Sequence, residues 1–252
     1  IKEVETKGVE IIIALDVSNS MLAEDYSPNR LERAKLAISR LVDKMKEDRI
    51  GLVVFAGQAF VQLPVTTDYV SAKMFLNSIN TNSVPVQGTA MADAINTCIK
   101  SFSQDSKNSR AIILITDGEN HEDDPVEAAK NANSLGIQVY TIGIGSPEGK
   151  PIPLPEGGFL KDKDGNMVVS KLDERTLVDV AKAGGGVYVK AGNSDFGLDA
   201  VVERIHNLEK QTYKSVVFED FDEQYMYFFA IALVLFILDF LIVNRKGKNL
   251  FK

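Results

Sequence analysis

The sequence predicts an α/β fold: a doubly wound, mostly parallel sheet with helices on both faces, followed by one C-terminal transmembrane helix. Continuous apolar runs alternate with segments whose apolar residues recur at helical spacing, which is typical of strands that are covered on both faces. A last apolar run, residues 225–243, is long enough to cross a bilayer. With 252 residues and 45% hydrophobic content, the chain can bury one sizeable core.

Six apolar runs are the expected strands of this sheet. They are Val9–Leu15, Ile50–Ala56, Ala59–Val65, Ala111–Thr116, Gln138–Ile144 and Val187–Lys190. The link between the second and third runs is as short as Gly57-Gln58, which favours a hairpin. The third run is therefore predicted to be an antiparallel strand at one edge.

Helical spacing marks the segments between these strands. The apolar stripes are Leu31, Ala34, Ile38, Leu41, Val42 and Met45; then Met91, Ala94, Ile95, Cys98, Ile99 and Phe102; and finally Leu198, Val201, Val202, Ile205 and Leu208. Asp124-Pro125 has the pattern of an N-cap followed by proline at the first helical position. Cys98, the single cysteine, is interpreted as a small core residue, because it lies on an apolar helix face.

Residues 145–169 form one long irregular insert that is rich in Pro and Gly. Asp164-Gly165 is a hairpin-turn signal. Asp162 and Asp164 have the spacing of a calcium loop, but the Gly stands at the fourth position of that loop and no Glu closes it. A turn is therefore favoured over a calcium site.

Oxygen-bearing side chains gather where two of the predicted strands end. The motif Asp16-Val17-Ser18-Asn19-Ser20 follows the first strand, Thr116-Asp117 closes another, and Gly88-Thr89 precedes a helix. In an open parallel sheet the carboxyl ends of the strands converge on one rim, so all three pieces are expected there. Oxygen ligands suit Mg²⁺, Mn²⁺ or Ca²⁺ rather than zinc or copper. The first motif alone is also consistent with an ordinary turn.

This constellation resembles the metal-ion-dependent adhesion site (MIDAS) of von Willebrand factor A domains. The resemblance extends from about Val9 to Lys210. It implies Mg²⁺ or Mn²⁺ as the cofactor and a partner protein that supplies a carboxylate to the metal. By this resemblance, and without substitution, the metal-site positions are Asp16, Ser18, Ser20, Thr89 and Asp117.

A closer resemblance is to the membrane-anchored Bat proteins of bacterial aerotolerance operons. It rests on residues 20–25, 28–32, 51–57 and 85–90, and the insert followed by an apolar segment is most like the BatB subgroup. The resemblance implies an envelope complex linked to stress and aerotolerance. Its other members would be sister membrane-anchored von Willebrand factor A proteins and a MoxR-type ATPase.

The residues that flank the last apolar run predict its orientation. Tyr225 and Tyr227 lie at one end, and the basic residues of 244–248 lie at the other. The positive-inside rule then places the domain in the periplasm and the C-terminus in the cytoplasm, across a bacterial inner membrane. The expected organisation is a lead-in at 1–8 after a missing upstream membrane segment, a von Willebrand factor A domain at 9–212, a linker at 213–224, the span at 225–243 and a basic tail at 244–252.

The net charge of the chain excludes some classes of binding partner. The formal net charge is −7, and several basic residues lie after the apolar run, so the preceding portion is more acidic still. Such a surface repels nucleic acid and anionic lipid. Asp239 lies inside the apolar run, where an ionised side chain is costly. It is expected either to reach the cytoplasmic interface or to meet a polar group of a neighbouring membrane helix.

Two other functions are compatible with the rim motif. A metal-dependent phosphoryl hydrolase would use Asp16 as its nucleophile, although the sequence has no D-x-D pattern and no suitable Lys motif there. A structural scaffold with an idle metal site is the other. The interpretation adopted is a metal-dependent interaction domain that is not an enzyme.

His121, four residues after Asp117, is interpreted as an exposed loop residue. Since strands run toward the rim and helices return, the metal site is expected to point away from the membrane.

Overall fold

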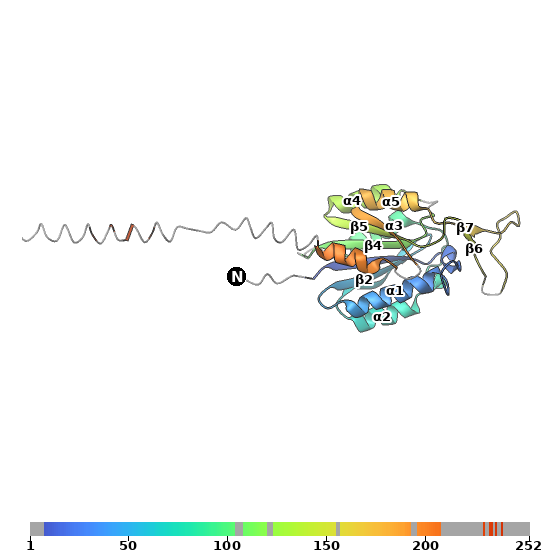
Figure 1. The fold of residues 1–252 in the computed structure, drawn as a ribbon, viewed down its shortest axis with the longest axis horizontal. Helices are drawn as coiled ribbons and strands as arrows, with labels where there is room; N and C mark the ends of the chain where they lie inside the picture. Colours follow the sequence, from blue (N-terminus) through green and yellow to red (C-terminus); the bar gives the residue numbers. More distant parts are fainter. Residues whose placement is uncertain are drawn as a thin grey trace, which may run out of the picture. The chain divides into compact units, whose positions relative to one another are not determined.

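A six-stranded sheet forms the centre of the fold (Figure 1). In the computed structural model its strand order is β3-β2-β1-β4-β5-β8, and every neighbouring pair is parallel except β2 and β3. The predicted mostly parallel sheet and its antiparallel edge strand are thus confirmed. The strands are β1 (Glu10–Asp16), β2 (Arg49–Phe55), β3 (Ala59–Thr66), β4 (Arg110–Thr116), β5 (Ile137–Gly143) and β8 (Gly185–Lys190).

The structure describes residues 8–103, 108–119, 123–154, 157–192 and 196–207, with Phe229, Ala232, Leu233, Leu235 and Leu238 as isolated helical positions. The chain divides into two units, Ile1–Glu209 and Lys210–Lys252. The first unit contains the sheet and the helices that cover it.

Helices cover both faces of the sheet (Figure 1). One face carries α1 (Arg30–Lys44), α2 (Tyr69–Ser78) and the helical residues 198–207, and the other carries α3 (Met91–Ser101), α4 (Pro125–Ser134) and α5 (Glu174–Ala183). Alternate residues of β1 supply the two cores. Ile11, Ile13 and Leu15 pack on the first face, and Ile12 and Ala14 pack on the second. This double burial explains why β1 is continuously apolar from Ile11 to Leu15 in the sequence.

Most of these helices have a capping side chain at the N-terminus. Asn29 accepts a hydrogen bond from the Glu32 N–H, and Asp124 accepts one from the Glu127 N–H, so the predicted Asp124-Pro125 start is confirmed. Helix α3 differs, because Ala90 precedes it. Asp123 Oδ2 instead accepts from the Ala92 and Asp93 N–H groups in the first turn of α3, at 2.8 and 3.1 Å.

Helices α2 and α5 are not among the helices predicted from the sequence. Only Ala72 and Leu76 of α2 are buried, while Val70 and Met74 are exposed, so no apolar stripe stands out. In α5 the buried residues span little more than one turn, from Leu177 to Ala181. Short stripes of this kind give a weak periodic signal. The core position of Cys98 is confirmed, because its side chain is buried among apolar neighbours.

The described residues of the insert form an arm, defined as residues 150–154 and 157–170, that projects from one end of the domain (Figure 1). Its root is a two-stranded antiparallel pair, β6 (Lys150–Pro151) and β7 (Val169–Ser170). Asp162 Oδ1 accepts from the N–H groups of Asp164 and Asn166, and Gly165 adopts φ +84°. The predicted turn is therefore confirmed.

The start of β1 and the end of helix 198–207 meet at the opposite end of the sheet from the ends of β1 and β4. Asp48 joins them: its Oδ1 accepts from the Val9 N–H at 2.9 Å, and both of its carboxylate oxygens lie 3.0 Å from His206 Nε2. Burial opposes ionisation of Asp48, but the His206 and Val9 hydrogen bonds outweigh it and lower the pKa of this carboxyl. Val9 and His206, near the two ends of the described part of this unit, therefore both lie at the end away from the rim.

Within the described residues, no helix combines the length and the apolar character needed to cross a membrane. Nearly all of the predicted span at 225–243 lies outside the described residues, and so do Asp239, the linker at 213–224 and the tail at 244–252.

A matched pair of valines tests this account of the sheet. Val53 of β2 is 1% exposed, and its cross-strand partner Val61 of β3 is 45% exposed. Val53→Ala should lower the free energy of unfolding by about 2–3 kcal/mol, because it removes two buried methyl groups and leaves a cavity. Val61→Ala should cost about 1 kcal/mol or less. Urea unfolding measures both values; equal losses would contradict the assignment of β3 as a half-exposed edge strand.

Candidate metal centre

Two carboxylates stand at the ends of adjacent strands. Asp16 is the last residue of β1, and Asp117 directly follows β4. The parallel register pairs Leu15 with Ile115, which brings the two strand ends to the same level. Both side chains are fully buried. The predicted rim is therefore formed by these two strands.

The loop after β1 is held by the Asp16 carboxylate. Asp16 Oδ1 accepts from the Ser18 N–H at 2.8 Å, and Asp16 Oδ2 accepts from the Thr116 hydroxyl at 2.6 Å. The Ser18 and Ser20 hydroxyl oxygens lie 2.9 Å apart. A two-residue spacing thus brings a carboxylate and two hydroxyls into one small cluster.

Thr89 reaches the rim on a separate loop before α3. Gly88 adopts φ +141°, a conformation that side chains rarely allow, and the Ala90 N–H donates to the Ala56 carbonyl at 2.7 Å. Gln87 Oε1 accepts from the Asn19 N–H at 3.0 Å, which ties this loop to the loop after β1. Thr89 is buried, but in the described part of the chain its hydroxyl makes no hydrogen bond to the other four predicted ligands.

Arg30 is the cation of this region. Its side chain is 0% exposed and forms a bidentate pair with Asp25, at 2.8 Å for each bond. Its Nη1 also donates to Asp117 Oδ2 at 2.9 Å and to the Ser170 hydroxyl at 2.6 Å. Burial would lower the pKa of Arg30, but its contacts with Asp25 and Asp117 outweigh burial and raise it. Arg30 is therefore a permanent positive charge.

The balance of charge differs between the two strand-end carboxylates. Arg30 pairs with Asp117, whereas no cationic side chain among the described residues pairs with Asp16. Burial, together with repulsion from Asp117, raises the pKa of Asp16 to about 7, although hydrogen bonds from Ser18 and Thr116 act in the opposite direction. The rim therefore lacks positive charge on the Asp16 side.

This donor set fits a hard divalent cation. A cation at the rim would compensate the buried Asp16 carboxylate, and hydroxyl and carboxylate oxygens are ligands that Mg²⁺ and Mn²⁺ accept. Within the described residues, no group of three or more His, Cys, Asp or Glu side chains is arranged to hold a metal. The candidate centre is instead a mixture of two carboxylates and three hydroxyls.

Three residues of this network have no role in the sequence-based prediction. They are Asp25 and Arg30, which are close in the sequence, and Ser170, which is remote from both and meets them only in the folded chain. Arg30 has one local signal, since a basic residue in the first turn of a helix opposes the helix dipole. Ser170, at the end of the insert, has none. His121 lies outside the described residues.

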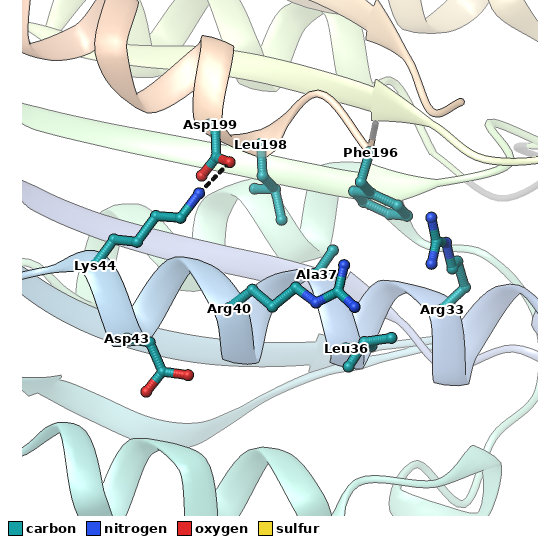
Figure 2. Close-up of a pocket in the computed structure, with 9 residues that line it drawn as sticks. All are labelled: Arg33, Leu36, Ala37, Arg40, Asp43, Lys44, Phe196, Leu198 and Asp199. Carbon is teal, nitrogen blue, oxygen red and sulfur yellow. Dashed lines mark hydrogen bonds and ion pairs between the residues drawn. The ribbon is translucent and has the colours of Figure 1, made fainter. Parts of the chain in front are cut away.

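A groove of about 350 Å³ lies between α1 and residues 196–199 (Figure 2). Lys44 pairs with Asp199 across it at 2.5 Å, and Asp43 pairs with Lys73 of α2. The groove contains none of the predicted site residues. The groove is therefore separate from the candidate metal centre.

Comparison with known proteins gives a consistent result. A family model described as the von Willebrand factor type A domain matches residues 11–119. The sequence of BatB from Bacteroides thetaiotaomicron is 50% identical to this chain. Its crystal structure matches with a TM-score of 0.75, over 82% of this chain and 100% of that one. An aerotolerance-related membrane protein from Bacteroides fragilis is also 50% identical, with a TM-score of 0.77 and coverage of 79% and 100%.

A more distant structure shares the fold alone. Proximal thread matrix protein 1 from the mussel byssus is 17% identical, with a TM-score of 0.57 over 81% of this chain and 46% of that one. Its MIDAS motif is occupied by zinc in that structure.

The raised pKa of Asp16 predicts a pH-dependent stability in the absence of metal. A carboxyl with a higher pKa in the folded than in the unfolded protein binds extra protons when folded, so this group's contribution to stability falls as the pH rises from about 4 to above 7. In EDTA, Asp16→Asn should raise the Tm at about pH 8, by about 2–4 °C for each kcal/mol relieved.

The gain should shrink as the pH falls toward about 4, because the folded carboxyl is then protonated and the unfolded one begins to be, and it should vanish below the ordinary pKa of an aspartate, where both states are protonated. Thermal unfolding at a series of pH values measures it. If wild type and Asp16→Asn lost stability in parallel across this range, the charge penalty would not lie on Asp16.

Proposed function

This chain belongs to the von Willebrand factor type A family, in the group of the Bacteroides Bat proteins, and on that premise we propose that its rim binds Mg²⁺ or Mn²⁺ and captures a carboxylate of a partner protein. The observation that carries the proposal is the buried Asp16 carboxylate, which lacks a cationic partner in the described structure and lies beside the two serine hydroxyls.

The donor set supports capture of a ligand. Neutral hydroxyls at Ser18, Ser20 and Thr89 would hold the ion without cancelling its charge, and Asp16 and Asp117 would hold it directly or through water. An ion with mostly neutral direct ligands stays electrophilic, so it attracts a further oxygen anion. The zinc-occupied MIDAS motif of the mussel protein is a precedent for a divalent cation on this fold.

The geometry gives less support to a phosphoryl hydrolase. A nucleophilic carboxylate must reach the phosphorus atom with a free oxygen. Asp16 is 0% exposed, and both of its oxygens already accept hydrogen bonds, from Ser18 and Thr116. This arrangement holds the carboxylate in place. The function proposed is therefore interaction, without catalysis.

The cellular setting is proposed from the relatives and the sequence. The Bacteroides fragilis relative is described as an aerotolerance-related membrane protein. We place this chain in a bacterial inner membrane through residues 225–243, with the domain in the periplasm and the basic tail in the cytoplasm. Its partners would be sister membrane-anchored von Willebrand factor A proteins and a MoxR-type ATPase, in an envelope complex linked to aerotolerance.

Asp16→Ala tests the metal site. Calorimetric titration with MgCl₂ should show binding to the wild type and none to the variant, because the variant loses the carboxylate that anchors the loop after β1. Asp124→Ala is the matched control: it removes an exposed carboxylate that caps α4 and should bind Mg²⁺ as the wild type does. Unchanged affinity in a folded Asp16→Ala variant would remove Asp16 from the site, and Ser20→Ala provides a milder second variant.

Partner capture separates the three functions. A tagged chain should retain specific membrane proteins in the presence of Mg²⁺, and should release them in EDTA or when it carries Asp16→Ala. Retention that is indifferent to EDTA would favour a structural scaffold with an idle site. Turnover of a phosphoester that depends on Asp16 would favour the hydrolase.

A further inference from the structure

Asp117 is held by two residues that are not predicted metal ligands. Its Oδ2 accepts from Arg30 Nη1 and from the Ser170 hydroxyl, each at 2.9 Å. Its Oδ1 accepts a longer bond, from the Glu119 N–H at 3.3 Å. One oxygen of this carboxylate is therefore fixed from two directions, while the other is less constrained.

Arg30 and Ser170 also fix each other. The Arg30 guanidinium donates to the Ser170 hydroxyl at 2.6 Å, and that hydroxyl donates onward to Asp117. The pair of bonds between Arg30 and Asp25 holds the guanidinium plane in place. All four side chains are buried or nearly so, so water competes little for these bonds.

Ser170 is the last residue of the arm, so this network connects the arm to Asp117. Three backbone contacts fasten the arm's root to the same region: the Lys171 N–H donates to Glu119 Oε1 at 2.8 Å, the Asp173 N–H donates to the Asp117 carbonyl at 2.8 Å, and the Ser146 N–H donates to Asp25 Oδ2 at 2.7 Å. The root of the arm and the loop that carries Asp117 are thus one hydrogen-bonded unit.

We propose that Arg30 and Ser170 are positioning residues that orient Asp117 toward a metal ion, and that Ser170 couples the arm to metal binding. This inference rests on the proposed function, since it requires an ion at the rim. Groups that hydrogen-bond to a ligating carboxylate orient it, and their loss typically costs about 10- to 100-fold in metal affinity. Coupling between two sites is reciprocal, so an arm that orients Asp117 is itself steadied when the ion binds.

The first measurement is Mg²⁺ affinity by calorimetry. Ser170→Ala removes the hydroxyl and leaves every predicted metal ligand intact, and it should weaken Mg²⁺ binding about 10- to 100-fold. Ser146→Ala is the matched control. Ser146 lies in the loop that leads into β6, the other strand of the arm's root, where its hydroxyl accepts from the Gly149 N–H at 3.1 Å, and the variant should bind Mg²⁺ as the wild type does.

The second measurement is hydrogen exchange of the arm, which a purely structural role of Ser170 would not link to metal. Addition of Mg²⁺ should slow amide exchange in the arm of the wild type and of Ser146→Ala. In Ser170→Ala, at Mg²⁺ concentrations that saturate the weakened site, the arm should exchange at its metal-free rate. Arg30→Lys keeps the charge but loses the planar fork, and it should also weaken Mg²⁺ binding.

The outcomes are distinct. If the wild type binds no Mg²⁺, the proposed function fails, and the inference fails with it. If the wild type binds Mg²⁺ and Ser170→Ala binds it equally well, the positioning role of Ser170 is overturned while the proposed function stands. If affinity falls but arm exchange never responds to Mg²⁺, the coupling of the arm is overturned. Equal weakening in Ser146→Ala would reduce the effect to general loosening of the arm's root.

Discussion

The burial of two neighbouring carboxylates, together with their mutual repulsion, is the constraint around which the rim is built. Asp16 and Asp117 stand at the ends of adjacent parallel strands, and in a water-poor setting their like charges interact strongly. The chain offsets this unequally. Among the described residues, Asp117 receives a guanidinium and a hydroxyl, while Asp16 receives an amide and a hydroxyl but no cation. What remains is a deficit of positive charge on one side of the rim, which a divalent cation would fill.

The rest of the fold holds Asp16 and Asp117 in the positions that create this deficit of positive charge. The double burial of β1 and β4 fixes the strand ends, because any slip in register would expose apolar residues of two cores. Helix α1 begins beside the rim and delivers Arg30 from its first turn. The arm closes the arrangement from the other side through Ser170. Three segments that are remote in sequence therefore depend on one carboxylate, Asp117, for part of their mutual placement.

The sequence predicts those features that have a local signature. Strands buried on both faces are continuous apolar runs, so β1 and β4 are found within about a residue of their ends, and a carboxylate directly after such a run is placed at the rim by topology alone. Arg30 and Ser170 escape prediction because their roles depend on contacts across the folded chain. An arginine in an amphipathic helix is ordinarily solvent-exposed, and its complete burial here is decided by Asp25 and Asp117. Helices α2 and α5 escape for a different reason, since their buried stripes are too short to show a period.

The same electrostatics explains why the proposed function would require the metal. A partner's carboxylate that approached the bare rim would meet Asp16 and Asp117, whose charges Arg30 only partly offsets, and it would be repelled. A divalent ion adds two positive charges at that point and reverses the sign of the interaction, and the effect is large because the site is screened from water. Hydroxyl ligands preserve this reversal, whereas further carboxylates in the place of Ser18 and Ser20 would neutralise the ion before a partner arrived. In this arrangement the serines would bind the ion but leave most of its positive charge uncompensated. Affinity for the partner would therefore follow occupancy of the metal site.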